Sequence, residues 1–455
     1  MTTMTSAQSV SSYLDRHQGR EPGTKIQYGH PSPRFWDRAQ LSQAALLAPA
    51  VSDRPLNLYL HIPFCPPTDP EACGFCLFAR EDYTSYALVE AYMRDLYAEL
   101  ASVAALLGRR TLHTLYFGGG TPNILSAATI RAVFARLHEH FDIPASCETT
   151  FEGTPGLFTV ARLEALREVG VTRVSIGAQT LKPRLILYSG RTQRLEHVER
   201  AITFCRDNGM FCSVDLITGW FDQTAEDVVD DIRQLAAWGA TGIVNHPLTL
   251  GGDSVFARRK HELPPVDVTR DAFMAGRAAL VELGYRADGY TDYRRADLPP
   301  VTFLEMYRDV LRHDRVGVGY GANSLLTGTL DAPGHTYKNV VGRANYHQRV
   351  AAGESCVESV FRFDRSDLQL LYVLKGLEGC PYLDAKAYAA VFGSDLGEDF
   401  APWWEALSAR GWLQWNDGQP RLVGDGIFYT SEVQRCISQP RNHQLRRGAP
   451  ASDED

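Results

Sequence analysis

From residue 56 onward, the apolar residues of the chain follow two alternating patterns. Short runs rich in β-branched and aromatic residues alternate with longer segments in which apolar residues recur every three or four positions. The first pattern predicts strands and the second predicts amphipathic helices. The predicted strands are Leu56–Ile62, Leu112–Phe117, Glu148–Glu152, Thr172–Gly177, Phe211–Ile217 and Gly242–Leu250. The predicted helices are Tyr83–Leu107, Ala127–His140, Thr159–Val169, Leu195–Asn208 and Ala225–Trp238.

Repeated strand–helix units of this kind predict an α/β fold with a parallel sheet. The number of units between residues 56 and 250 suits a partial (β/α)6 barrel better than a full eightfold barrel. A second helix–strand stretch, at residues 265–330, is expected to extend or close the sheet. We therefore assign residues 56–330 to a barrel domain with its extension.

The two ends of the chain differ from the barrel in texture. Residues 1–55 mix polar residues with Gly and Pro, which predicts an N-terminal arm. Beyond Arg362 helical segments dominate, and Asn416-Asp417-Gly418 predicts a hairpin turn between two short strands. We expect a smaller, mostly helical, winged-helix-like C-terminal domain at residues 331–438 and a disordered tail at residues 439–455.

Composition narrows the class of protein. The chain has 455 residues, of which 44% are apolar, and a formal net charge of −8, which argues against a general nucleic-acid binder. No run of about 18 apolar residues predicts a membrane span, and the polar N-terminus does not look like a signal peptide. Nine cysteines, three of them bunched together, do not suggest a secreted disulfide framework. We expect a cytoplasmic monomer that acts on a small molecule.

The three bunched cysteines are the most informative feature of the chain. Cys65, Cys73 and Cys76 follow directly on the first predicted strand, at the end where (β/α) barrels carry their catalytic loops. Three thiolates so close together suit a soft, multinuclear metal site, and they would leave one iron of a [4Fe–4S] cluster open to an outside ligand. A zinc site is the alternative, with His61 available as its fourth ligand. Three unrelated buried thiols are a further alternative.

Further motifs follow the cysteines in order along the chain. They are Tyr59–Cys65, Tyr116–Pro122, Phe151-Glu152, Arg173–Gln179, Gly190-Arg191 and Val214–Gly219. Together they resemble the oxygen-independent coproporphyrinogen III oxidase-like branch of the radical S-adenosylmethionine (SAM) enzymes. The resemblance continues through Gly317–Ser324 to Gly426–Tyr429. It implies a radical SAM barrel, a [4Fe–4S] cluster on Cys65, Cys73 and Cys76, and SAM as the ligand of the open iron.

The resemblance also assigns residues to the first SAM molecule. Gly119, Gly120 and Thr121 would receive its amino and carboxylate groups, since residues without side chains let the backbone approach a ligand closely. Glu152 would bind the ribose. Tyr59 and Phe75 would pack near the cluster and the nucleoside. The alternative for the glycine run is a plain tight turn, and each aromatic residue could simply be part of the core.

A second SAM molecule is implied by three more positions. Gln179, Arg191 and Asp215 match residues that bind it in coproporphyrinogen oxidases, and an Arg can pair with a carboxylate through two hydrogen bonds. The alternative is an Arg–Asp pair that joins strand ends. His246 is expected to line the cavity rather than to bind a ligand.

Three departures from the branch pattern bear on function. Seven residues, Pro66–Ala72, fill the first gap of the cysteine motif, where three are usual. Coproporphyrinogen oxidases carry a further Cys where this chain has Phe78. The heme chaperones of the branch carry a His-Asn…Tyr-Trp motif that residues 294–315 lack. The last two departures favour the methyltransferase and cyclopropanation-type (class C) members.

These observations give one leading prediction and two alternatives. The leading prediction is reductive cleavage of SAM to a 5′-deoxyadenosyl radical, followed by C-methylation or related C–C bond formation on an unsaturated or aromatic substrate with a second SAM. The electron would come from a flavodoxin or a ferredoxin. The alternatives are a porphyrin-modifying oxidase or decarboxylase, and a heme-binding chaperone.

Overall fold

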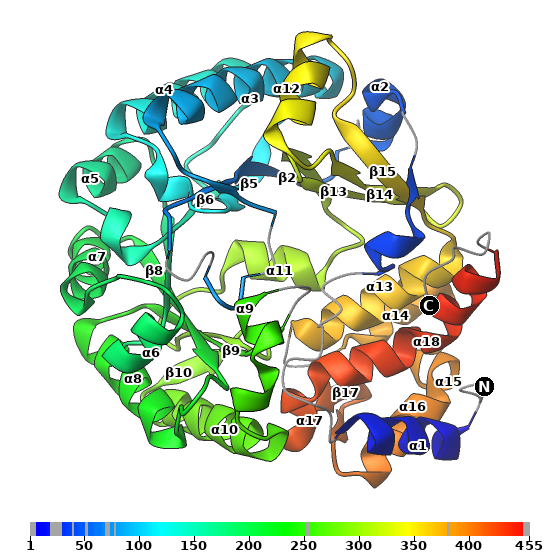
Figure 1. Cartoon of the computed structure of the whole chain (residues 1–455). Helices are drawn as coiled ribbons and strands as arrows, with labels where there is room; N and C mark the ends of the chain where they lie inside the picture. The colour runs from blue at the N-terminus through cyan, green and yellow to red at the C-terminus, as the bar shows by residue number, and fades with distance from the viewer. Residues whose placement is uncertain are drawn as a thin grey trace.

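A computed structural model of the chain describes residues 6–18, 30–38, 41–50, 53–68, 73–76, 79–250, 254–379 and 383–448. Its centre is a curved parallel sheet, seen end-on in Figure 1. The parallel strands that carry the repeats are β2 (Leu56–Ile62), β5 (Leu112–Gly119), β6 (Glu148–Gly153), β7 (Arg173–Gln179), β8 (Phe211–Thr218) and β9 (Gly242–Pro247). The predicted partial (β/α)6 barrel is confirmed.

Helices cover the outer face of this sheet, as Figure 1 shows. They are α3 (Tyr86–Leu107), α4 (Ala127–His140), α5 (Val160–Glu168), α7 (Leu195–Asp207), α8 (Ala225–Trp238) and α10 (Val266–Glu282). Side-chain caps fix several of their starts: the hydroxyls of Ser126, Thr159 and Thr224 each accept an N–H of the first turn. Alternate strand residues such as Val174 and Val214 are fully buried. The other alternate positions are left to face the barrel interior.

The sheet is extended at both edges rather than closed. On one side β12 (Asp314–Val318) joins β2 in parallel, followed by the antiparallel strands β13 (Asn323–Gly328), β14 (Pro333–Asn339), β15 (Val357–Arg362) and β1 (Asp37–Arg38). On the other side β11 (Asp292–Arg295) and β10 (Tyr285–Ala287) continue from β9. The predicted boundary after residue 330 therefore falls inside the β13–β14 hairpin, and the sheet continues to Arg362.

The C-terminal region is mostly helical. Its helices are α13 (Arg365–Glu378), α14 (Ala385–Phe392), α15 (Leu396–Asp399), α16 (Ala401–Ala409), α17 (Asp425–Phe428) and α18 (Thr430–Gly448). The hairpin β16 (Leu413–Asn416) and β17 (Gln419–Leu422) turns at Asp417 and Gly418, both with positive φ, as a tight hairpin turn requires. The predicted disordered tail is wrong for residues 439–448, because α18 extends through them and its apolar side packs on the C-terminal core. Residues 449–455 lie outside the described part.

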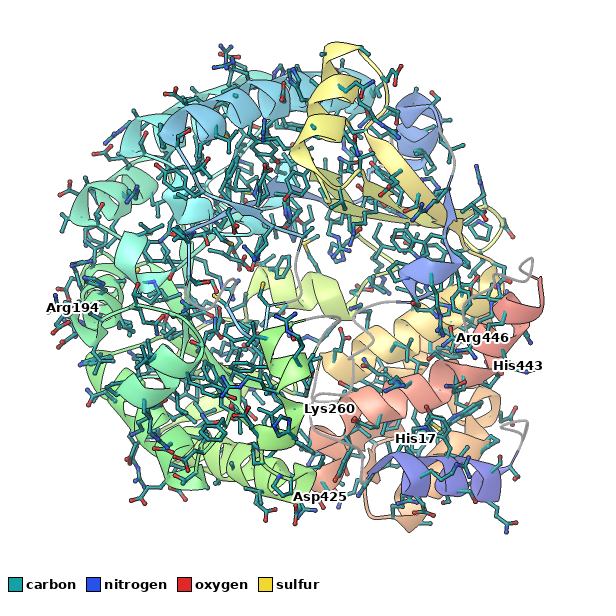
Figure 2. The ribbon with its side chains drawn as sticks, in the orientation of Figure 1. His17, Arg194, Lys260, Asp425, His443 and Arg446 are labelled. Atoms are coloured by element: carbon teal, nitrogen blue, oxygen red, sulfur yellow. The ribbon has the colours of Figure 1, made fainter. Side chains whose placement is uncertain are left out.

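The N-terminal arm contributes to both cores. Helix α1 (Ala7–Gln18) buries Val10, Tyr13 and Leu14 among the C-terminal helices. Figure 2 places His17 of this helix on the same side of the molecule as His443 and Arg446 of α18. Helix α2 (Gln43–Leu47), in contrast, packs on the barrel core. None of the helices in the described ranges combines the length and hydropathy that a bilayer crossing demands.

Candidate functional site

The cysteine loop lies at the carboxyl end of β2. Cys65 ends the short strand β3 (Phe64–Cys65), which pairs in parallel with β4 (Glu81–Asp82). Cys73 and Cys76 form one tight turn, closed by a 2.9 Å hydrogen bond from the Cys76 N–H to the Cys73 carbonyl. All three thiols are half-buried, whereas the other cysteines in the described ranges are buried.

Two neighbouring segments hold this turn in place. The Gly74 N–H donates to the Ser189 carbonyl at 3.2 Å, just after α6 (Pro183–Tyr188). The Gly74 carbonyl accepts the Phe256 N–H at 2.9 Å, from α9 (Val255–Arg258). Phe75, predicted to lie near the cluster, packs on Phe256 and Trp220 with ring centroids 6.2 and 5.6 Å away. The turn is therefore anchored through both its backbone and its aromatic side chain.

The Cys65 thiol lies close enough to Cys73 and Cys76 to interact with both electrostatically, as the ligands of one cluster would. Burial raises the pKa of the Cys65 thiol to about 11, the nearby Cys73 and Cys76 add to the rise, and the Thr121 hydroxyl lies 3.5 Å from its sulfur. Among the described residues, no three His, Cys, Asp or Glu side chains converge on the position of a single metal ion. A four-iron cluster instead takes its three thiolates on three separate irons. The middle of the Pro-rich gap, residues 69–72, and Phe78 lie outside the described residues.

His61, the fourth ligand of the zinc alternative, is engaged elsewhere. Its Nε2 donates to the Ala79 carbonyl at 3.1 Å, and its Nδ1 accepts the Tyr59 hydroxyl at 3.0 Å. Burial lowers the pKa of His61 to about 4, so the ring is neutral and this tautomer is fixed. His61 thereby ties the Tyr59 hydroxyl to the end of the cysteine loop, and the zinc alternative loses its ligand.

The glycine run folds tightly against its own surroundings. Gly119 has φ of +114°, and a Cβ there would lie 2.7 Å from the His61 ring; at Gly120 it would lie 2.4 Å from the Pro63 carbonyl. The Gly120 N–H donates to the Ile62 carbonyl at 2.8 Å, and the Gly119 N–H donates to the Glu152 carboxylate. Contacts within the protein therefore explain why both positions are glycine, and they give both backbone N–H groups an acceptor. Their contact with SAM, like that of Thr121, stays a prediction.

Glu152 lies near the end of β6, beside Tyr116, an aromatic residue that had been given no role of its own from the sequence. Tyr116 donates its hydroxyl to this carboxylate, and burial raises the pKa of Glu152. The Tyr116 ring packs on Tyr59, with centroids 6.0 Å apart, and on Phe303 of α11 (Thr302–Arg308) at 4.6 Å. One oriented carboxylate therefore lies beside Tyr59, where a ribose with two hydroxyl donors could bind.

The three residues predicted for a second SAM lie around one backbone position, Gly177. Arg191 donates to the Gly177 carbonyl at 2.5 Å, and Asp215 lies opposite Gly177 in the β7–β8 ladder. Gln179 ends β7 with φ of +68°, at an irregularity of the same ladder. No ion pair joins Arg191 to Asp215 in the described part of the chain: Arg191 also bonds the Thr154 hydroxyl at 3.0 Å, and Asp215 accepts the Ser175 hydroxyl at 3.1 Å. The structure therefore does not form the Arg–Asp pair between strand ends that was the alternative to a second SAM site.

Arg173, at the start of β7, is a buried charge that sequence reasoning missed. Arg173 is 6% exposed, its Nη1 donates to the Thr150 hydroxyl at 3.5 Å, and its Nε has no hydrogen-bond partner among the described residues. Its positive charge favours the ionised forms of the buried carboxyl groups, because it lowers the pKa of both Glu152 and Asp215, whereas burial raises them. A charged residue within an otherwise apolar strand was the signal that could have identified it.

Asp215 gives a pH-dependent prediction. Burial raises its pKa to about 6; Glu152 adds to the rise, while His246, Arg173 and Ser175 oppose it. Between about pH 4 and pH 6 the folded state therefore keeps a proton on Asp215 that the unfolded state has released. Binding of this proton stabilises the folded state, and that stabilisation is lost as the pH rises through 6. Asp215→Asn should raise the free energy of unfolding by about 1–3 kcal/mol at pH 7.5 and much less at pH 4.5. Urea unfolding at both values tests this, and a variant less stable at pH 7.5 would contradict it.

Comparison with known proteins agrees with this arrangement. Residues 59–235 match the family model of the radical SAM superfamily. The heme chaperone HemW of Haemophilus influenzae is 28% identical over 278 residues, which cover 60% of this chain and 71% of the relative. The oxygen-independent coproporphyrinogen III oxidase of Cereibacter sphaeroides is 31% identical over 255 residues, 54% of each chain. The solved coproporphyrinogen III oxidase of Escherichia coli, at 22% identity, superposes with a TM-score of 0.77 over 93% of this chain and 98% of its own, which shows a shared fold.

Proposed function

We propose that this protein cleaves SAM reductively and directs the radical to a tetrapyrrole, because residues 59–235 match the radical SAM family model and the relatives named above are coproporphyrinogen III oxidases and HemW heme chaperones. The observation that carries the proposal is the half-buried cysteine turn at the carboxyl ends of parallel strands, above a polar barrel interior. The relatives named above support a tetrapyrrole substrate; they give no support to the C-methylation that we predicted from Phe78 and residues 294–315.

Each residue of the site has a part in this proposal. Cys65, Cys73 and Cys76 would hold the cluster, which when bound supplies one electron to SAM and so yields methionine and a 5′-deoxyadenosyl radical. Glu152, oriented by Tyr116 and the Gly119 amide, would accept the ribose hydroxyls. Tyr59, fixed by His61, would lie against the nucleoside. The surrounding strands and helices would exclude water from the radical.

Product analysis tests the proposal against its two rivals. Anaerobically reconstituted protein, reduced with dithionite, would be incubated with SAM and coproporphyrinogen III or heme. We expect 5′-deoxyadenosine to form together with a changed tetrapyrrole, with carbon dioxide released if the reaction is a decarboxylation. S-adenosylhomocysteine with a methylated product would instead establish methyl transfer. Tight heme binding without 5′-deoxyadenosine would establish a chaperone, although residues 294–315 lack the His-Asn…Tyr-Trp motif of the heme chaperones.

Arg191→Ala tests whether a second SAM binds. Arg191→Ala should remove a charge-assisted contact to the carboxylate of the second SAM. The binding of that SAM should weaken by about 1.5–3 kcal/mol, roughly ten- to a hundredfold in affinity, because no other predicted ligand is a cation. Equilibrium dialysis should then count two SAM molecules per wild-type chain and one per Arg191→Ala chain. Arg194→Ala, at an exposed residue nearby in sequence, is the matched control. Since Arg191 also bonds Gly177 and Thr154, lower thermal stability with an unchanged count would mean a structural role only.

A further inference from the structure

A basic rim borders the cysteine loop of this otherwise acidic chain. Arg258, Arg259, Lys260 and His261 are consecutive, and with Glu262 they carry a net charge of +2, counting His as neutral, against −8 for the whole chain. Arg258, Lys260 and His261 are exposed. The rim follows Phe256, whose N–H is bonded to Gly74 of the loop at 2.9 Å. A local positive charge thus lies within one helical turn, along the chain, of the residue that is bonded to the cysteine loop.

An exposed apolar patch continues from the basic rim through one aromatic side chain. The Arg259 guanidinium lies 4.6 Å from the centroid of Tyr188, which stacks on Phe221 at 4.9 Å and packs on Phe256 at 5.1 Å. Leu187 and Phe221 remain 74% and 38% exposed. Among the exposed large apolar side chains of the described residues, Leu187 has the largest exposed fraction, and it adjoins Tyr188, which stacks on Phe221.

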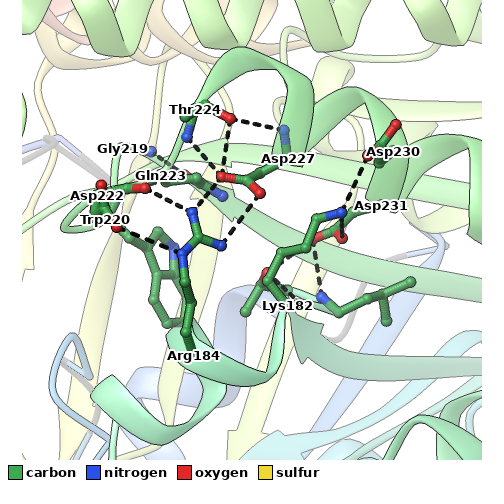
Figure 3. Close-up of polar contacts among 12 residues, drawn as sticks. Lys182, Arg184, Gly219, Trp220, Asp222, Gln223, Thr224, Asp227, Asp230 and Asp231 are labelled. Atoms are coloured by element: carbon green, nitrogen blue, oxygen red, sulfur yellow. Dashed lines mark hydrogen bonds and ion pairs between the residues drawn. The ribbon is translucent and has the colours of Figure 1, made fainter.

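The helix that carries this patch is firmly held. Figure 3 shows Arg184 of α6 bonded to Asp227 of the α8 capping box, with Nη2 2.6 Å from Oδ2, and Lys182 bonded to Asp230 at 3.3 Å. The backbone N–H of Leu181 also donates to Asp231 at 2.9 Å. The patch is therefore presented on a fixed base, and the Ser189 carbonyl that follows it supports Gly74. One rigid unit joins the surface to the cysteine turn.

We propose that the basic rim, together with Leu187 and Phe221, is the docking surface for a small acidic one-electron carrier protein that reduces the cluster. This inference rests on the proposed function, since only a redox cluster needs such a partner. The carrier is oxidised by one electron and the cluster is reduced by that electron, with no atom passing between the proteins. Charge complementarity favours an acidic partner at the rim, because the rim carries a net charge of +2 although the whole chain carries −8.

A small anionic substrate is the competing occupant, and the shape of the surface disfavours it. Small ligands bind in concave sites that bury most of their surface. Leu187 at 74% exposure and the exposed Lys260 instead form an open face, on which apolar contacts and peripheral charges suit another protein. Binding of a small anionic substrate at the rim is therefore one of the outcomes that the test distinguishes.

The test compares two reductants on the same cluster. Arg258→Glu/Lys260→Glu reverses two exposed charges, and Leu187→Ser removes the apolar contact; all three residues are exposed, so folding should be retained. Reduced flavodoxin is the probe, and dithionite, which needs no docking, is the internal reference. The matched control is Arg194→Glu, which is 71% exposed and lies at the outer edge of the barrel, far from Lys260 in Figure 2.

We expect the double charge reversal to slow cluster reduction by flavodoxin about tenfold at low salt and to weaken flavodoxin binding in parallel, with dithionite reduction unchanged. Added salt should slow the wild-type reaction and narrow this difference, because salt screens exposed charges. Unchanged flavodoxin rates and binding would overturn the docking surface. A raised KM for an anionic substrate, with flavodoxin reduction unchanged, would assign the rim to substrate instead. Wild-type protein that holds no reducible cluster would overturn the proposed function itself.

Discussion

Replacing any one of Cys65, Cys73 or Cys76 with Ala should abolish the cluster and all SAM cleavage. A [4Fe–4S] cluster with an open iron already has only three protein ligands, and the structure places three half-buried thiols in one loop, Cys65 at the end of β3 and Cys73 and Cys76 in the turn that follows. Anaerobic reconstitution should give about four irons per wild-type chain and a broad visible absorption. Each single variant should lose both the iron and the absorption.

Cys147→Ala provides the matched control for the cysteine triad. Cys147 is buried at the start of β6, with its sulfur 4.0 Å from the Glu148 carbonyl, and is not part of the loop. Its replacement should lower stability slightly and leave the iron content unchanged. The assignment would be wrong if Cys147→Ala lost the cluster while the three loop variants kept theirs.

Glu99→Ala should have the largest effect on stability. Glu99 is 3% exposed, and its carboxylate accepts the Gly319 N–H at 2.7 Å, the Asn339 amide at 2.7 Å and the Tyr346 hydroxyl at 2.6 Å. Burial raises its pKa, and these three donors oppose that rise. Alanine would leave the Gly319 N–H and the Tyr346 hydroxyl buried without the acceptor they now have, and would leave the Asn339 amide only the Gly319 carbonyl, at a cost of about 3–5 kcal/mol in the free energy of unfolding.

Two further variants decide how Glu99 acts. Glu99→Gln keeps one acceptor oxygen and should lose less stability than Glu99→Ala. Glu90→Ala, at an exposed position of the same helix, should change the free energy of unfolding by less than about 0.5 kcal/mol. Thermal unfolding of the three proteins measures this order. Equal losses in Glu99→Ala and Glu90→Ala would show that the hydrogen bonds of Glu99 do not matter for stability.

The regular part of the barrel could be predicted because its periodicity is strong. The predicted limits of β2, α4 and α8 agree with the structure at both ends. Buried parallel strands are continuous apolar runs, and the helices between them show a clear apolar face, so both signals are local. The antiparallel edges of the sheet depend on pairings between distant segments, such as β1 with β15, and no local pattern predicts these.

The errors at the ends have physical causes as well. Helix α18 is rich in Arg and contains Pro440, so its few apolar residues did not stand out from a polar tail. Val433, Cys436 and Ile437 nevertheless lie at helical spacing, and all are buried. Glu99 was missed for the opposite reason: it stands within the apolar face formed by Leu96, Leu100 and Val103. A lone charge on such a face is the signal of a buried polar network.

For the candidate site, the sequence predicted residues whose roles stay predictions, and it did not predict the contacts that the structure forms between them. Cys65, Glu152 and Gly177 lie at or near the carboxyl ends of β3, β6 and β7, and Glu152 interacts electrostatically with Asp215. The inward contacts of the glycine run and the anchoring of Gly74 by Ser189 and Phe256 could not be predicted, because they join segments far apart in sequence. A substitution such as Gly119→Val would strain the loop and displace His61, so it is a poor test of SAM binding.

The most direct test of the central claim is formation of 5′-deoxyadenosine. Wild-type protein with its reconstituted, dithionite-reduced cluster should convert SAM to equal amounts of 5′-deoxyadenosine and methionine, quantified by mass spectrometry. The Cys65→Ala variant should form neither above the level of a protein-free control. A wild-type protein that carries a fully reduced cluster, binds SAM and releases no 5′-deoxyadenosine with any tetrapyrrole offered would contradict the account.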